Sequence, residues 1–218
     1  RPVVVLGMGG FASGPGGIAA WLMRIPLLIH EQNAIAGLTN RLLAPFASSI
    51  MTAFPKVFKK SSKVIMTGNP TREDIHNISK PEQRYVNRKP KLLKILVLGG
   101  SQGAEKLNKI VPETLCNFND NCIVKVKHQC GEKHFSNTQK TYRNYNIPAE
   151  VFPFIEDIVS AYMWADIVIC RAGASTISEL AACGIASVLI PFPFAVDNHQ
   201  VKNAEYLVHN GAAVLVKE

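Results

Sequence analysis

The sequence predicts an α/β protein with two parallel, doubly wound sheets. Short apolar runs bounded by Gly or Pro alternate with helix-length amphipathic segments, which is the pattern of successive βα units. A polar stretch that contains Pro81 and Pro90 separates two groups of such units. The 218 residues are 47% hydrophobic, so the chain is long and apolar enough to bury a core.

The first group of predicted elements spans residues 1–68. Strands are expected at residues 3–6, 27–29, 49–52 and 64–66, and helices at residues 17–23 and 37–43. The chain begins in an apolar strand, without an initiator Met, a basic segment or a cleavage site, so we expect a cut end and an incomplete first domain. The group ends at residues 68–72, and residues 69–91 are predicted to form a hinge and linker.

The second group spans residues 92–218. Strands are expected at residues 94–98, 123–127, 150–152, 167–169, 187–190 and 213–216. Helices are expected between them, at residues 103–115, 132–145, 155–164, 176–182 and 199–209. Six strands with five crossovers make a doubly wound sheet, and such sheets hold ligands at their carboxyl edge.

The charge of the chain favours an anionic partner. Lys and Arg total 24 against 16 acidic residues, a formal net charge of +8. Many of the lysines lie in polar segments without interleaved aromatic residues to stack on bases, so nucleic acid is not an expected partner. The five cysteines form no Cys-x-x-Cys pair and are expected to be reduced.

Residues 7–12, Gly-Met-Gly-Gly-Phe-Ala, fit the G-x-G-x-x-A pattern of a phosphate-binding turn, and Glu31 stands where a ribose-binding acid belongs. A dinucleotide oxidoreductase is therefore one open alternative. The following Gly14-Pro15-Gly16-Gly17 is expected to break a helix that starts there. We predict instead a long loop that ends at a helix N-terminus near Gly17, where free N–H groups suit a phosphate. A purely structural turn explains the same glycines.

Two further loops join strands to helices at the predicted carboxyl edge of the second sheet. Residues 99–103, Gly-Gly-Ser-Gln-Gly, lack the Lys of a Walker loop but place a hydroxyl and helix N–H groups at that edge. In residues 171–179 two explanations compete for Glu179. It forms a capping box with Thr176, or it accepts hydrogen bonds from a ribose diol.

Polar residues also follow two other apolar runs. His30-Glu31-Gln32-Asn33 follows a predicted strand and precedes a helix, so its side chains are expected at a carboxyl edge. Asp197-Asn198-His199-Gln200 follows Pro191-Phe192-Pro193 and opens a helix. A helix cap explains either segment equally well.

Together these segments, in this order and at these intervals, resemble the bacterial peptidoglycan N-acetylglucosaminyltransferases of the MurG family across essentially the whole chain. The matching motifs are residues 7–17, 30–37, 68–72, 99–103, 171–179 and 197–200. The resemblance implies a GT-B type fold, in which two Rossmann-like doubly wound domains face each other across a cleft. It also implies that residues 1–68 belong to the acceptor-binding domain and residues 92–218 to the donor-binding domain without its final helices.

The resemblance implies UDP-N-acetylglucosamine as donor, undecaprenyl-linked lipid I as acceptor, and no cofactor. The residues at the positions of the family's donor contacts are Asn33, Arg72, Ser101, Ile155, Ala174, Ser175, Thr176, Ile177, Ser178, Glu179 and Gln200. The resemblance implies that the backbone of Ile155 forms hydrogen bonds with the edge of the uracil base. It also implies that Ser101 and the helix N-terminus near Ala174 bind the diphosphate. Glu179 would bind the ribose, and Gln200 would bind the hydroxyls of the sugar.

The catalytic residue is not assigned. The histidine usually proposed as the family's general base would lie upstream of Arg1, so the chain alone is expected to be inactive. His30 and Glu31 are candidate contributors. Gly14, Gly16 and Gly17 match the family segment thought to bind the acceptor's diphosphate. No Asp-x-Asp occurs in the sequence, so metal-independent catalysis is expected.

The resemblance further implies a peripheral enzyme at the cytoplasmic face of the bacterial plasma (inner) membrane. Trp21, Arg24 and Arg41 are candidates for contact with anionic lipid, although core packing explains Trp21 equally well. Two alternatives stay open beside peptidoglycan synthesis. One is a related GT-B glycosyltransferase that acts on another glycolipid, and the other is a donor-binding subunit that needs a partner chain.

Overall fold

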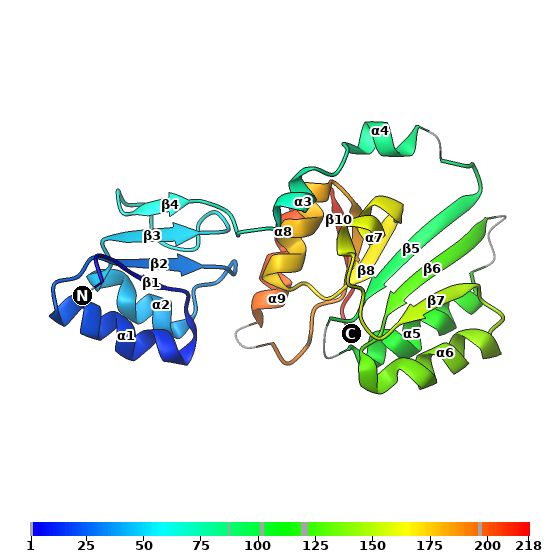
Figure 1. Cartoon of the computed structure of the whole chain (residues 1–218), viewed down its shortest axis with the longest axis horizontal. Helices are drawn as coiled ribbons and strands as arrows, with labels where there is room; N and C mark the ends of the chain where they lie inside the picture. Colours follow the sequence, from blue (N-terminus) through cyan, green and yellow to red (C-terminus); the bar gives the residue numbers. More distant parts are fainter. Residues whose placement is uncertain (1, 87, 101–102, 119–121, 196–197) are drawn as a thin grey trace.

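The computed structural model describes residues 2–86, 88–100, 103–118, 122–195 and 198–218. The chain forms two parallel sheets joined by a connecting segment (Figure 1). The first sheet has the strand order β1-β2-β3-β4 and the second has the order β10-β9-β8-β5-β6-β7. The predicted α/β class with two parallel sheets is therefore confirmed.

The first sheet consists of four parallel strands with helices on one side (Figure 1). Its elements in chain order are β1 (Val5–Gly7), α1 (Gly10–Leu22), β2 (Leu27–Glu31), α2 (Leu38–Leu43), η1 (Ala44–Phe46), β3 (Ser49–Thr52) and β4 (Val64–Met66). Leu27 and Ile29 of β2 and Leu43 of α2 are buried together between the sheet and its helices. The loops of residues 8–9 and 32–37 follow the carboxyl ends of β1 and β2. Because these two strands are parallel, both loops lie at the same edge of the first sheet.

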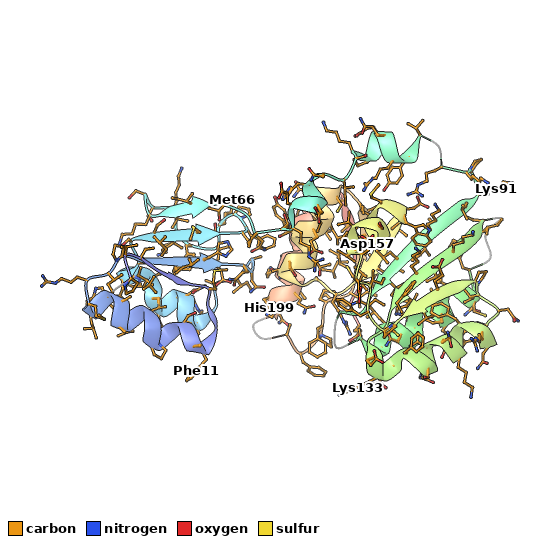
Figure 2. All side chains as sticks on the ribbon, viewed as in Figure 1. Phe11, Met66, Lys91, Lys133, Asp157 and His199 are labelled. Atoms are coloured by element: carbon orange, nitrogen blue, oxygen red, sulfur yellow. The ribbon has the colours of Figure 1, made fainter. Side chains whose placement is uncertain are left out.

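Helix α1 begins directly after the glycine turn and runs through Pro15. The prediction of a long loop that ends near Gly17 was therefore wrong. Packing outweighs the weak helix propensity of this segment, because Gly17 lies so close to α2 that an added Cβ would be 2.7 Å from Leu43 Cδ1. Pro15 lies on the exposed side of the helix. Phe11 projects from the first turn and is 94% exposed (Figure 2).

The connecting segment contains two short helices, α3 (Glu73–His76) and α4 (Pro81–Tyr85), where the sequence predicted only a linker. Both helices contact the second sheet's unit rather than the first. Ile75 of α3 is fully buried in the core of that unit. Arg84 Nη2 of α4 donates a hydrogen bond to the carbonyl of Cys183 at 2.7 Å.

The second sheet is the larger one, with six parallel strands. Its elements in chain order are β5 (Leu92–Leu98), α5 (Glu105–Cys116), β6 (Ile123–Gln129), η2 (Glu132–His134), α6 (Phe135–Asn144), β7 (Ala149–Phe152), α7 (Ile158–Trp164), β8 (Ile167–Cys170), α8 (Ala174–Cys183), β9 (Ala186–Leu189), α9 (His199–His209) and β10 (Ala213–Leu215). Every predicted strand and helix of this group is present, with bounds that differ by a few residues.

Alternate residues of β5 face opposite sides of the sheet, which shows that the fold is doubly wound. Ile95 and Val97 are buried against Val111 of α5 and Tyr142 of α6. Leu96 and Leu98 are buried in a larger cluster on the other side, with side chains of α7, α8 and α9. The chain starts in the middle of this sheet and winds outwards twice, which is the Rossmann strand order.

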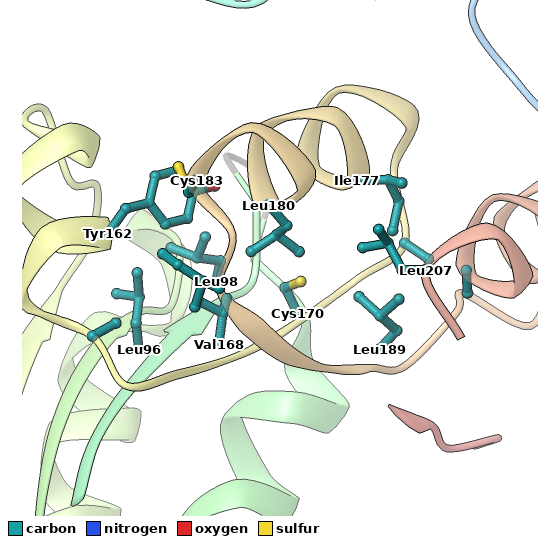
Figure 3. Close-up of a cluster of buried hydrophobic side chains, with 14 of the residues drawn as sticks. Leu96, Leu98, Tyr162, Val168, Cys170, Ile177, Leu180, Cys183, Leu189 and Leu207 are labelled. Carbon is teal, nitrogen blue, oxygen red and sulfur yellow. The ribbon is translucent and has the colours of Figure 1, made fainter. Parts of the chain in front are cut away.

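The larger cluster is the main core of the molecule (Figure 3). Leu180 of α8 and Leu207 of α9 pack there above Val168 and Leu189 of the sheet. Phe54, from the segment after β3, reaches the same cluster and meets the ring of Tyr206 edge to face at 5.3 Å between centroids. Within the described residues, no helix is long and apolar enough to cross a bilayer.

Candidate functional site

A cavity of about 330 Å³ lies at the carboxyl edge of the second sheet. The strand order reverses there between β5 and β8, and ligands of open α/β sheets bind outside such a switch point. The cavity brings together six of the residues predicted as donor contacts, namely Arg72, Ile155, Ser175, Thr176, Glu179 and Gln200. Residues from the connecting segment, α8 and α9 therefore converge on one site.

Of the other five predicted contacts, the four that the structure describes do not line this cavity. Ser101 lies outside the described residues, as does the neighbouring Gln102. The side chain of Ile177 is buried in the core. Ser178 Oγ accepts a hydrogen bond from Asn69, and Ala174 packs against the core. Asn33 lines a separate cavity of about 290 Å³ beside the first sheet.

The loop between β5 and α5 passes very close to the carboxyl end of β6. Gly103 has φ +76°, and an added Cβ would collide with the carbonyl oxygen of Cys130. Gly99 donates its N–H to the carbonyl of Gln129 at 2.9 Å. Only glycine fits at residue 103, because both the backbone angle and the close approach exclude a side chain.

A buried network supports the carbonyl that this loop touches. Asn108 Nδ2 donates to the Cys130 carbonyl at 3.0 Å, and Asn108 Oδ1 accepts from His128 Nε2 at 3.0 Å. His128 Nδ1 then accepts from the Tyr142 hydroxyl at 2.9 Å. His128 is 0% exposed, and its burial lowers its pKa to about 3. The ring is therefore neutral, and the network holds α5, β6 and α6 together.

Helix α8 presents an uncapped N-terminus to the cavity. Its N-cap is Gly173, no side chain caps it, and no acidic residue lies in its first turn. Gly173, Ser175 and Thr176 line the cavity, so the free N–H groups and the positive end of the helix dipole are available to an anion. Of the two explanations for Glu179, the capping box with Thr176 is wrong, because the helix begins at Ala174 and Thr176 lies inside it.

Glu179 has another partner in place of the capping box. The Tyr162 hydroxyl of α7 donates to Glu179 Oε2 at 2.8 Å. Burial and the adjacent Glu179 carboxylate raise the pKa of Tyr162, so the hydroxyl stays protonated and continues to donate. This bond orients the carboxylate through Oε2, and within the described residues Oε1 has no hydrogen-bond partner. A ribose diol placed in the cavity has an oriented acceptor.

The backbone of Ile155 also lies in this cavity, but its N–H is already used. It donates to Oε1 of Gln129, the last residue of β6, at 2.9 Å. The Ile155 carbonyl is left as the acceptor for a base edge. Gln129 is buried and lines the cavity, although it lies in none of the motifs that predicted the site.

A neighbouring cavity of about 570 Å³ shares Arg171 and Gln200 with the first. Arg171 Nη1 donates to the carbonyls of Ile190 and Pro191, and its guanidinium lies 5.5 Å from the centre of the Phe192 ring. Gln200 Oε1 accepts the Phe192 N–H at 2.8 Å. Together the two cavities offer the volume expected for a small-molecule ligand. Asp197 lies outside the described residues.

The residues His30 and Glu31 are buried and hydrogen bonded within the chain. Glu31 accepts from the N–H groups of Asn33 and Gly37 at 3.0 Å each and from Asn40 Nδ2 at 2.8 Å. His30 Nε2 donates to the Gly68 carbonyl at 2.9 Å. Glu31 therefore shapes the loop after β2, and a catalytic contribution of either residue stays a prediction.

Gly14, Gly16 and Gly17 were predicted to bind the acceptor's diphosphate partly because a loop before a helix N-terminus was expected there. Gly14, Gly16 and Gly17 lie inside helix α1 rather than in a loop before a helix. The helix N-terminus is at Gly10, and it lies beside Asn33 in the 290 Å³ cavity. Among the described residues, no three His, Cys, Asp or Glu side chains lie close enough together to hold a metal ion.

The sequence matches two family models. Residues 94–218 match the glycosyltransferase family 28 C-terminal domain, and residues 1–52 match the glycosyltransferase family 28 N-terminal domain. Proteins from Marinobacter nauticus and Ectopseudomonas mendocina are 51% and 53% identical over the whole chain. Both are named UDP-N-acetylglucosamine--N-acetylmuramyl-(pentapeptide) pyrophosphoryl-undecaprenol N-acetylglucosamine transferase. The chain spans 60% of the length of each.

Solved structures agree with these matches. The crystal structure of Acinetobacter baumannii MurG has a TM-score of 0.88 and 42% identity, over 99% of this chain and 60% of that one. A glycotransferase of kitacinnamycin has a TM-score of 0.69 at 15% identity, over 100% of this chain and 63% of its own, and so shares the fold alone. The predicted GT-B type fold is confirmed.

Proposed function

The chain belongs to glycosyltransferase family 28, and from this premise we propose that it is part of an inverting N-acetylglucosaminyltransferase of peptidoglycan synthesis. The reaction moves N-acetylglucosamine from UDP-N-acetylglucosamine to the 4-hydroxyl of the MurNAc-pentapeptide of undecaprenyl-linked lipid I and forms lipid II. The observation that supports this most strongly is about 51% identity, along the entire chain, to relatives named for this transfer.

The donor belongs at the carboxyl edge of the second sheet, with residues 92–218 as the donor-binding domain. The α8 N-terminus faces the diphosphate, Glu179 Oε1 accepts from the ribose, and the Ile155 carbonyl accepts from the uracil N3–H. Gln200, shared by both cavities, contacts the sugar. Residues 1–68 belong to the acceptor-binding domain, and residues 69–91 form the hinge.

The chemistry follows from charge development on the leaving group. The acceptor oxygen forms a bond to the anomeric carbon while the bond from that carbon to the diphosphate breaks, and the hydroxyl proton passes to a base. Negative charge grows on UDP, where the α8 N-terminus stabilises it by about 0.3 to 2 kcal/mol. Arg72 also lines the cavity and adds positive charge, whereas Arg171 lines it with its Nη2 in an ion pair with Glu218 Oε1 at 2.8 Å.

The first sheet's helices support peripheral contact with an anionic membrane at the cytoplasmic face. Trp21 is 47% exposed and Leu22 is 68% exposed at the end of α1. The Trp21 ring lies 4.7 Å from the Phe46 ring between centroids, so it is partly packed and partly free. Arg24, just after α1, and Arg41 of α2 are exposed and supply positive charge toward lipid headgroups.

The test of this function is transfer of radiolabelled N-acetylglucosamine from UDP-N-acetylglucosamine to lipid I by the full-length gene product. The expected product is lipid II, with inversion at the anomeric carbon. Glu179→Ala is expected to reduce transfer, while Glu205→Ala, in an exposed pair with Lys202 on α9, is expected not to. Transfer to a different glycolipid and not to lipid I contradicts the proposal.

A further inference from the structure

Another cavity, of about 480 Å³, lies at the amino edge of the second sheet, and we call it the amino-edge cavity. It is bounded by α4, by the segment that leads into β5 and by the end of α7 (Figure 1). Among the described residues it shares no lining side chain with the 330 Å³ cavity at the carboxyl edge. The charged side chains that line it are Arg84, Arg88, Lys89, Lys94 and Asp166.

The carboxylate of the amino-edge cavity already has partners on both oxygens. Asp166 Oδ1 forms an ion pair with Arg88 Nε at 3.0 Å, and Oδ2 accepts the backbone N–H of Lys94 at 2.8 Å. Arg88 Nη2 also donates to the carbonyls of Met163 at 3.0 Å and Ala165 at 3.3 Å. These bonds fix Arg88 at the end of α7, where the helix dipole favours a positive charge.

The other three cations, Arg84, Lys89 and Lys94, have no ion-pair partner within the described part of the chain. Arg84 Nη2 donates to a carbonyl at the end of α8, but Nε and Nη1 of the same guanidinium are buried without a hydrogen-bond partner. Burial, and then the positive charge of Arg88, lower the pKa of Lys94. Because unpaired buried donors and neighbouring like charges both cost free energy, these groups favour an anion in the cavity.

We propose that the amino-edge cavity is a binding site for the phosphate group of a small soluble molecule. Guanidinium and ammonium groups are the side chains that bind phosphate, and two arginines and two lysines line the cavity beside one carboxylate. Its volume of about 480 Å³ lies in the range of small-molecule sites. Met163, which also lines it, offers apolar contact to the rest of the ligand. This inference does not rest on the proposed function.

The position of the cavity favours a soluble ligand over a lipid headgroup. The proposed membrane contact lies on α1 and α2. In Figure 1 these two helices lie below the first sheet, whereas α4 lies at the top of the second sheet's unit. A bilayer that contacts α1 and α2 therefore lies away from the amino-edge cavity.

The first measurement maps the binding of inorganic pyrophosphate by backbone amide NMR shifts of the chain at constant ionic strength. Saturable shifts are expected at Gln83 and Asp166, which both line the amino-edge cavity. Pyrophosphate also suits the N-terminus of α8, so the amides of Ser175 and Thr176 report on that cavity separately. Shifts confined to Ser175 and Thr176, or shifts that do not saturate, would overturn the proposal.

The second measurement repeats the titration with variants that leave the arginine hydrogen bonds in place. The Lys89→Gln/Lys94→Gln double variant is expected to weaken binding at the amino-edge cavity by roughly tenfold or more, while Lys94→Arg keeps the charge and stays within about threefold. Lys91→Gln is the matched control, because Lys91 is exposed at the amino end of β5 and does not line the cavity (Figure 2). An equal loss in Lys91→Gln would show general attraction to a basic surface and overturn the site.

A third measurement decides the source of the phosphate group, by sedimentation of the chain with phosphatidylglycerol vesicles. The Lys89→Gln/Lys94→Gln variant is expected to bind the vesicles as the unsubstituted chain does, because the proposed membrane contact lies elsewhere. A loss of vesicle binding that exceeds the loss in Lys91→Gln would assign the cavity to a lipid headgroup and overturn the soluble ligand.

Discussion

The hydrogen bond from Tyr162 to Glu179 gives a prediction about ribose recognition. The 2.8 Å bond orients Oε2, so Oε1 is left for the donor. Hydrogen bonds to charged groups contribute roughly 1.5 to 3 kcal/mol, so Glu179→Ala is expected to weaken UDP binding by about 10- to 150-fold. Tyr162→Phe keeps the carboxylate and loses only its orientation, so roughly a fivefold loss is expected.

The assay is calorimetry with UDP and 2′-deoxy-UDP against the native chain, Glu179→Ala and Tyr162→Phe. Removing the 2′-hydroxyl is expected to weaken binding to the native chain and to have almost no further effect in Glu179→Ala. The matched control is Glu205→Ala, because Glu205 is a half-exposed carboxylate outside the cavity and is paired with Lys202. If the 2′-hydroxyl contributes equally in native and Glu179→Ala proteins, the carboxylate does not bind the ribose and the reasoning is refuted.

Three further results are expected. Burial holds the pKa of His128 at about 3, below its unfolded value of 6.5, so the free energy of unfolding should fall as pH drops from about 6.5 toward 3, by up to about 1.4 kcal/mol per pH unit. In urea titrations, His128→Gln should flatten this dependence on pH. An unchanged dependence would exclude His128 as its cause. Gly103→Ala should lower the melting temperature and the donor affinity more than Gly211→Ala. Both glycines have positive φ, but of the two only Gly103 lies so close to another residue that an added Cβ would collide with it, namely with Cys130. Equal effects of the two variants would show that this collision does not determine the loss. Donor affinity should be the same in EDTA and in Mg²⁺, and a strict Mg²⁺ requirement would contradict metal-independent binding.

Much of the second sheet could be predicted from sequence, because its strands are short apolar runs and its helices have clear ends. Helix α9 was predicted with its observed bounds, His199–His209. The run that forms β5 was also placed, because Gly99-Gly100 ends it and the polar linker precedes it. Local patterns were sufficient where local propensity and tertiary packing agree.

The failures occurred where packing outweighs local preference or where partners are distant in sequence. Pro15 and its neighbouring glycines argue against a helix, yet the close contact between Gly17 and Leu43 stabilises one. The Tyr162–Glu179 bond spans 17 residues, and the Asn33–Asn203 bond spans 170, so no local motif signals either. The start of α8 at Ala174, two residues before Thr176, was enough to rule out the capping-box alternative for Glu179.

The donor site at the carboxyl edge of the second sheet is the central claim, and donor binding tests it most directly. We would titrate the chain with UDP-N-acetylglucosamine, UDP-glucose and NADH by calorimetry in EDTA, in parallel with Glu179→Ala. The expected result is saturable binding of UDP-N-acetylglucosamine that exceeds binding of UDP-glucose and is weakened by Glu179→Ala. Binding of NADH in preference to the sugar nucleotide, or UDP-N-acetylglucosamine binding that Glu179→Ala leaves unchanged, would contradict the claim.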